Sequence, residues 1–141
     1  DVIADLAPLV AVTGLVGVFS VFLRRRAGVA RGTDDTLTAE EAAELALPEG
    51  RPAVLLFTAA GCAPCGPAKR VLEQTAARRG VDLITADVAE HPGLTAEHRI
   101  FRAPTALVLA AGGHAVARIS GVPRTTEVDA ALDQALASTP A

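Results

Sequence analysis

The sequence predicts a mixed α/β sheet covered by helices on both faces and preceded by one transmembrane helix. Three observations predict this: an uncharged apolar run near the N-terminus, short apolar strand patterns that alternate with helical ones, and a hairpin pattern near the C-terminus. The chain has 141 residues, of which 50 % are hydrophobic. It can therefore form one globular domain with a short appendage, and a two-domain enzyme is excluded.

Composition also excludes several functions. Aromatic residues make up 3 % of the chain, with no Trp and no Tyr, and the net charge is −3. Nucleic acid is therefore not an expected partner, because base-stacking side chains and a basic surface are both missing. Two cysteines are too few for a disulfide scaffold and three histidines are few for a metal enzyme, so the two thiols are interpreted as chemical groups.

Residues 6–23 contain no charged side chain. As a helix this run is about 27 Å long, close to the roughly 30 Å of a bilayer core, which predicts a span surrounded by membrane lipid. Asp1 and Asp5 precede the run and arginines at 24–26 follow it, so the positive-inside rule predicts a single-pass protein of the cell membrane with its C-terminal domain in the cytoplasm. Small residues within 6–23 also allow a membrane-protein partner to pack against the span.

The expected organisation is a transmembrane anchor with a basic collar at 1–26, a linker at 27–37 and a soluble domain at 38–141. Thr38 and Glu41 form a capping-box pattern, which predicts a helix at 39–46. The remaining expected elements are strands at 53–57, 81–88, 105–110 and 115–120, helices at 64–79, 95–99 and 125–137, and a hairpin turn at Gly112 and Gly113.

The most specific motif is Cys62-Ala63-Pro64-Cys65, which lies between a buried strand and a helix. In this context two thiols three positions apart are typical of a redox pair. The positive end of the helix dipole favours the thiolate, so Cys62 is the expected nucleophile and Cys65 the more buried resolving thiol.

The soluble part, over about residues 36–139, resembles the thioredoxin family. Its segment FTAAGCAPC is similar to the family's strand and active-site segment, and Arg102-Ala103-Pro104-Thr105 is similar to the family's second signature. The resemblance implies a thioredoxin-like fold, a cis Pro104 lying against the dithiol, and a substrate groove beside it. It further implies that Ala63, Pro64 and Pro104 support the active site and that Gly61, Ala103, Gly121 and Val122 bind substrate.

The sequence departs from the family pattern at three positions. Gly61 stands where the family usually has Trp, Leu56 replaces a buried acid, and Thr85 replaces the lysine beside that acid. A water route for the proton of the resolving thiol is therefore expected. The Ala-Pro pair between the cysteines resembles the Gly-Pro pair of thioredoxin, which favours a reducing couple on the order of −200 to −270 mV.

These observations predict a membrane-anchored thiol-disulfide oxidoreductase that reduces protein or small-molecule disulfides and needs no metal or organic cofactor. Its expected partners are a disulfide-containing protein substrate and an upstream electron donor that the sequence does not name. Two alternatives stay open: a redox-inert binding or assembly module of a membrane complex, and an extracytoplasmic thiol oxidoreductase if the topology is reversed. A reporter fused after residue 141 distinguishes the two orientations.

A zinc site is the other alternative for the two cysteines. His91, His98 and His114 do not form an H-x₃₋₅-H pair, so zinc is disfavoured. The three histidines are instead expected to be exposed loop and helix residues.

Overall fold

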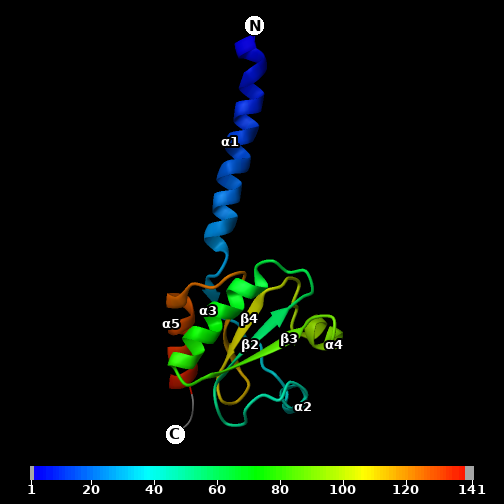
Figure 1. The fold of residues 1–141 in the computed structure, drawn as a ribbon, viewed down its shortest axis with the longest axis vertical. Helices are drawn as coiled ribbons and strands as arrows, with labels where there is room; N and C mark the ends of the chain where they lie inside the picture. Colours follow the sequence, from blue (N-terminus) through cyan, green and yellow to red (C-terminus); the bar gives the residue numbers. More distant parts are fainter. Residues whose placement is uncertain (1, 139–141) are drawn as a thin grey trace.

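The computed structural model describes residues 2–138 and shows a long helix leading into an α/β domain (Figure 1). The elements are α1 (Val2–Arg26), β1 (Ala30–Arg31), α2 (Ala39–Glu44), β2 (Ala53–Thr58), α3 (Cys65–Arg78), β3 (Asp82–Asp87), α4 (Pro92–Glu97), β4 (Thr105–Leu109), β5 (Ala115–Ser120) and α5 (Thr125–Ala137).

The strands form one five-stranded sheet in the order β1-β5-β4-β2-β3. Strands β2 and β3 are parallel, whereas β4 pairs antiparallel with both β2 and β5, and β1 is antiparallel to β5. The parallel pair requires a crossover, which α3 provides, and the antiparallel pair β4–β5 requires only the short turn at Gly112 and Gly113. The predicted mixed sheet is therefore confirmed.

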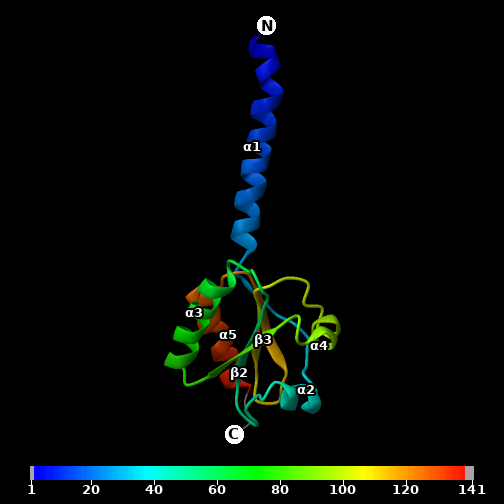
Figure 2. The ribbon, with the colours of Figure 1, turned by 45° about the vertical axis from the view of Figure 1, so that its right-hand side comes forward.

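Helices cover both faces of the sheet (Figure 2). The apolar residues of β2 alternate between the two faces: Val54 and Leu56 pack in the cluster under α3 and α5, and Leu55 and Phe57 pack in the cluster under α2 and α4. All four side chains are fully buried. A continuous apolar run in the sequence is thus explained by a central strand with two covered faces.

Two of the helix boundaries follow from local chemistry. At α2 the Thr38 side chain accepts a hydrogen bond from the Glu41 amide, and the Glu41 carboxylate accepts one from the Thr38 amide, as the capping box predicts. Helix α4 was expected at 95–99 but begins earlier, at Pro92. Proline is well suited to the first helical position, where its missing N–H has no helical partner.

Residues 27–37, expected as a linker, include part of the sheet. Ala30 and Arg31 pair with the end of β5, and the Gly28 amide donates a hydrogen bond of 2.8 Å to the Ser120 carbonyl. Gly28 has a φ of 74°, and a Cβ at this position would overlap the Val122 carbonyl. The chain is therefore attached to the domain within two residues of the end of α1.

Helix α1 is long and apolar enough to cross a membrane. Its window Leu6–Leu23 has none of its surface buried inside the structure, so the described part of the chain offers it no apolar cover. The Thr13 hydroxyl donates a 2.7 Å hydrogen bond to the Leu9 carbonyl, which satisfies this polar group within the helix.

Replacing Gly28 by alanine tests the attachment of α1 to the domain. A left-handed alanine costs about 1–2 kcal/mol, and the clash with Val122 adds to this cost, so we expect Gly28→Ala to lower the free energy of unfolding. Gly50→Ala is the matched control, because Gly50 has a φ of 65° and open space around it. Urea unfolding of both variants should give a loss at Gly28 larger by at least about 1 kcal/mol; equal losses would contradict a close contact there.

Candidate functional site

The two cysteines lie where β2 gives way to α3. Strand β2 ends at Thr58, and a turn closed by a 3.3 Å hydrogen bond from the Cys62 amide to the Ala59 carbonyl leads to Cys62. The Cys65 amide then donates to the Cys62 carbonyl, also at 3.3 Å, and Cys65 is the first residue of α3. Cys62 therefore precedes the helix, as expected, and α3 begins at Cys65 with Pro64 as its N-cap, one residue later than the predicted start at 64.

Cys62 and Cys65 are bonded as a disulfide with their Cα atoms 5.5 Å apart. This separation lies in the usual disulfide range of roughly 4.4–6.8 Å. Cys65 is buried, with 8 % of its surface exposed, whereas Cys62 is partly exposed. An incoming thiol or disulfide can thus reach the Cys62 sulfur more easily than the Cys65 sulfur.

Strand pairing brings the second sequence signature to the same end of the sheet. Phe57, near the end of β2, pairs with Thr105 at the start of β4, and Thr105 pairs with Ser120 at the end of β5. The residues before Thr105 and after Ser120 are joined by a 2.9 Å hydrogen bond from the Gly121 amide to the Pro104 carbonyl. The peptide bond between Ala103 and Pro104 is cis.

The other predicted site residues are accessible at this end of the sheet. Gly61, Ala63 and Pro64 are exposed in the turn before α3. Ala103, Gly121 and Val122 are partly or fully exposed at the start of β4 and the end of β5, whereas Pro104 is buried. The sequence-predicted residues therefore come together along one edge, and their individual roles stay predictions.

The region behind Cys65 is apolar. Leu56, at the position where the family has a buried acid, is fully buried in a cluster of aliphatic side chains that includes Leu72 of α3. Its partner across the β2–β3 pair is Thr85, which is exposed. Neither residue can accept a proton from the Cys65 thiol, so that proton must leave towards solvent or towards the reacting sulfurs.

A charged cluster supports the chain that leads to Pro104. The His98 ring contacts the Glu41 carboxylate at 2.9 Å and the Asp35 carboxylate at 3.7 Å. Arg118 pairs with Asp35 and donates a 2.6 Å hydrogen bond to the His98 carbonyl. The expectation that all three histidines are exposed was wrong for His98, which is 4 % exposed because these charged partners replace its contacts with water.

Both carboxyl groups of this cluster have lowered pKa values. Burial alone would raise the pKa of Asp35, but hydrogen bonds from Arg118 and Thr33 and the positive charge of Arg118 together lower it. Burial also acts against the Glu41 charge, and hydrogen bonds from Thr38 and His98 outweigh it, so the pKa of Glu41 is lowered as well. Sequence patterns missed this cluster because its members are separated by up to 83 positions in the chain.

The zinc alternative finds no group of ligands in the described part of the chain. Among residues 2–138 no three or more His, Cys, Asp or Glu side chains are grouped so that they could hold a metal ion. His91 contacts Glu44 at 2.6 Å, and His114 contacts Thr36 at 3.3 Å. Each histidine thus lies with other partners, away from the disulfide.

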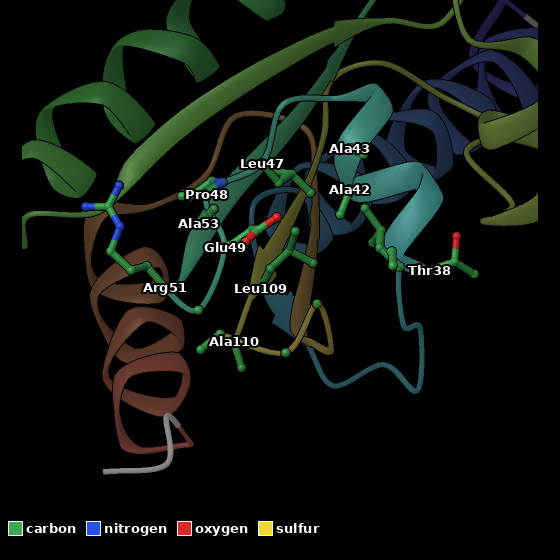
Figure 3. A pocket seen from close by; sticks show the side chains of 16 residues that line it. Thr38, Ala42, Ala43, Leu47, Pro48, Glu49, Arg51, Ala53, Leu109 and Ala110 are labelled. Carbon is green, nitrogen blue, oxygen red and sulfur yellow. The ribbon is translucent and has the colours of Figure 1, made fainter.

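A pocket of about 320 Å³ lies at the other end of the sheet from the cysteines (Figure 3). It is lined by Ala53 at the start of β2, Leu109 at the end of β4, and residues of α2 and the following loop such as Leu47. Its walls are largely apolar. The strand ends that line it lie at the opposite end of the sheet from Cys62. It is therefore separate from the candidate redox site.

Several solved structures with the same fold are thioredoxins. Chloroplastic thioredoxin z matches with a TM-score of 0.56 and 26 % identity, over 72 % of this chain and 93 % of that chain. Thioredoxin from Trypanosoma brucei brucei matches with a TM-score of 0.57 and 18 % identity, over 74 % and 94 % of the two chains. Thioredoxin 1 from Thermosipho africanus matches with a TM-score of 0.52 and 21 % identity, over 60 % and 93 %.

No protein-family model matches the chain, and no curated protein matches it. The structural matches nevertheless cover nearly the whole length of each thioredoxin and show the same fold. The 26 % identity with thioredoxin z also relates this chain to the thioredoxin family. The predicted resemblance and fold are therefore confirmed.

The charged cluster predicts how stability depends on pH. The folded protein keeps Asp35 and Glu41 ionised at pH values where the unfolded chain already binds protons, so the free energy of unfolding should fall as the pH drops below about 5. Asp35→Asn should flatten this dependence, because one of the two groups no longer titrates. Asp34→Asn, which changes the exposed neighbouring carboxylate, is the control. Urea unfolding between about pH 7 and pH 3 measures the slopes, and identical slopes for Asp35→Asn and wild type would contradict the assignment.

Proposed function

We propose that this thioredoxin-like chain is a membrane-anchored thiol-disulfide oxidoreductase that reduces disulfides of membrane-proximal substrates in the cytoplasm. One observation carries the redox assignment: the Cys62–Cys65 disulfide lies between β2 and α3 of a thioredoxin fold, with the more accessible sulfur on Cys62. A disulfide that closes within four residues can open and close again without rearranging the sheet.

In the proposed reaction the reduced protein donates two electrons. The Cys62 thiolate attacks one sulfur of the substrate disulfide, that bond breaks, and a substrate thiolate leaves while a mixed disulfide forms. Cys65 then loses its proton to water or to the departing thiolate and attacks the Cys62 sulfur. The second substrate thiolate leaves, the Cys62–Cys65 disulfide forms, and an external dithiol donor must reduce it again.

The supporting residues act through position rather than through their own chemistry. Ala63 and Pro64 separate the cysteines by one turn, which keeps Cys65 beside the Cys62 sulfur. Ala103 precedes β4, and Gly121 follows β5, the strand that is paired with β4. Both residues offer backbone groups to an extended substrate segment. Gly61 and Val122 border this surface, and the absence of a bulky side chain at Gly61 leaves the approach to Cys62 open.

Two features support the membrane anchoring. The apolar window Leu6–Leu23 is uncovered by protein, and an exposed apolar surface of this size is unfavourable in water. The arginines at 24–26 follow it directly, which favours a cytoplasmic location for the domain under the positive-inside rule. The anchor at 1–26 and the domain that follows it are thus the proposed working units.

The end of the sheet that carries the candidate redox residues, which we call the redox edge, lies at the end of the domain from which α1 leaves. Figures 1 and 2 both show the turn between β2 and α3 beside the base of α1. Ala27, which follows α1, lies against Gly121, and Gly28 is bonded to Ser120. A disulfide close to the bilayer surface is therefore the substrate that this geometry favours.

Cysteine variants test the redox assignment. Cys62→Ser should lose all measurable turnover, because no thiolate is left to attack the substrate. Cys65→Ser should retain the first step and accumulate a mixed disulfide, because the resolving thiol is missing. Reduction of a soluble fluorogenic disulfide gives the rates, and mass spectrometry after non-reducing separation identifies the trapped substrate. Turnover by Cys62→Ser at the wild-type rate would exclude Cys62 as the nucleophile.

A spacer variant tests the membrane-proximal site. A flexible 20-residue Gly-Ser segment inserted between Arg26 and Ala27 moves the domain by roughly 25 Å from the end of α1. We expect pre-reduced protein in vesicles to reduce a lipid-linked disulfide several-fold more slowly, while its rate with a soluble disulfide stays unchanged. The same insertion between Gly112 and Gly113 is the control. An unchanged rate with the lipid-linked disulfide would contradict the proposed placement.

A further inference from the structure

A second pocket, of about 480 Å³, lies beside the base of α1 on the face of the sheet that carries α4. Its walls come from the end of α1, from β1, from the chain between α4 and β4, and from the strand ends at Thr105 and Ser120. We name it the arginine pocket, after the side chains that dominate its lining. These are Arg26, Arg31, Arg99, Arg102 and Arg118.

The arginine pocket is strongly positive. Its described lining contains five arginines, two hydroxyl residues and no carboxylate. Arg118 is paired with Asp35, but in the described part of the chain Arg31, Arg99 and Arg102 form no ion pair. The domain around the pocket is acidic, with nine basic and fourteen acidic side chains after Gly32. A local concentration of unpaired guanidinium groups in an acidic domain points to an anionic ligand.

Arg118 fixes the shape of the pocket wall. Its guanidinium donates hydrogen bonds to the carbonyls of His98, at 2.6 Å, and Arg99, at 3.2 Å. These bonds hold the end of α4 against β5, and the pairing with Asp35 supplies the opposing charge. Arg118 is therefore a positioning residue, and the side chains available to a ligand are those of the unpaired arginines.

Arg99 occupies a backbone position that favours glycine. It follows the C-cap of α4 with a φ of 52°, and the Ile100 amide bonds to the Thr95 carbonyl as in a Schellman motif. The end of α2 has the same arrangement, with Ala46 at a φ of 52° and the Leu47 amide bonded to Ala42. At both positions glycine relieves strain, so Arg99→Gly removes a pocket charge without harming the fold.

The location of the pocket indicates the source of the anion. Leu23, the last apolar residue of the proposed span, lines the pocket together with Phe101. Phe101 is 87 % exposed, and an exposed Phe beside basic side chains is typical of surfaces that enter the interface of a bilayer. With α1 placed across a bilayer as proposed above, the arginines and Phe101 lie near the level of its headgroups.

We propose that the arginine pocket binds the phosphate group of an anionic phospholipid headgroup, with Phe101 inserted beside it. This proposal rests on the membrane anchoring proposed above. Guanidinium groups from three separate segments surround one phosphate and form charge-assisted hydrogen bonds to its oxygens. A bound headgroup fixes the rotation of the domain on the bilayer and keeps the edge with Cys62 turned towards the membrane.

Thermal unfolding of the full chain in neutral detergent micelles tests this proposal. Micelles doped with phosphatidylglycerol should raise the unfolding midpoint by about 4 °C or more relative to micelles doped equally with phosphatidylcholine. Arg99→Gly and Arg102→Gln should each lose at least half of that shift. Ala46→Gly, which relieves the same backbone strain elsewhere, and Arg70→Gln, which removes an exposed charge on α3, should keep it.

Two further arms identify the source of the phosphate. Inorganic phosphate added to phosphatidylcholine micelles should give a smaller shift, and Phe101→Ser should weaken the phosphatidylglycerol shift alone. An equal shift with inorganic phosphate would overturn the lipid as the ligand. A phosphatidylglycerol shift that is the same in Arg99→Gly, Arg102→Gln and Arg70→Gln would overturn the pocket itself.

Separate variants test the redox function and the lipid site. Cys62→Ser should keep the phosphatidylglycerol shift, and Arg99→Gly should reduce a soluble disulfide at the wild-type rate. Loss of thiol exchange therefore does not remove the lipid shift, and loss of the lipid shift leaves thiol exchange intact.

Discussion

The pairing of β4 with both of its neighbours is the constraint on which the rest of the structure depends. Because β4 is antiparallel to β2 and to β5, the end of β2, the start of β4 and the end of β5 fall on one edge. Residues from three distant parts of the chain, Cys62, Pro104 and Gly121, thereby reach the same end of the sheet. Strand β4 is buried on both faces, so a one-residue slip would exchange the side chains that pack under α3 and α5 with those that pack under α2 and α4.

The end of α1 meets the sheet at this same end. Strand β1 has only two residues, yet its antiparallel pairing with β5 continues the sheet to Gly28, which is bonded to Ser120. Helix α1 and the end of the sheet that carries Cys62 are thus connected by backbone hydrogen bonds. In the proposed anchoring this connection sets the position of the domain relative to the bilayer, and the arginine pocket lies between the end of α1 and the sheet.

Elements with a local signal could be predicted from the sequence, and those held by distant partners could not. The capping box at Thr38, the apolar run of β2 and the glycines of the β4–β5 turn each determine their element within a few residues. Strand β1 has no such signal, because two residues become a strand only through β5. His98 was expected to be exposed for the same reason: its partners Asp35, Glu41 and Arg118 lie far away in the chain.

The apolar region behind Cys65 connects these observations to the chemistry. The Leu56 side chain has no polar atom and Thr85 is an exposed hydroxyl rather than a base, so neither of these two residues takes up a proton leaving Cys65. In the proposed reaction that proton passes to water or to the departing thiolate. In the proposed anchoring this end of the sheet lies near a bilayer, so contacts around Arg99 and Phe101 affect the approach of a membrane-linked disulfide, while exchange with a soluble disulfide does not depend on them.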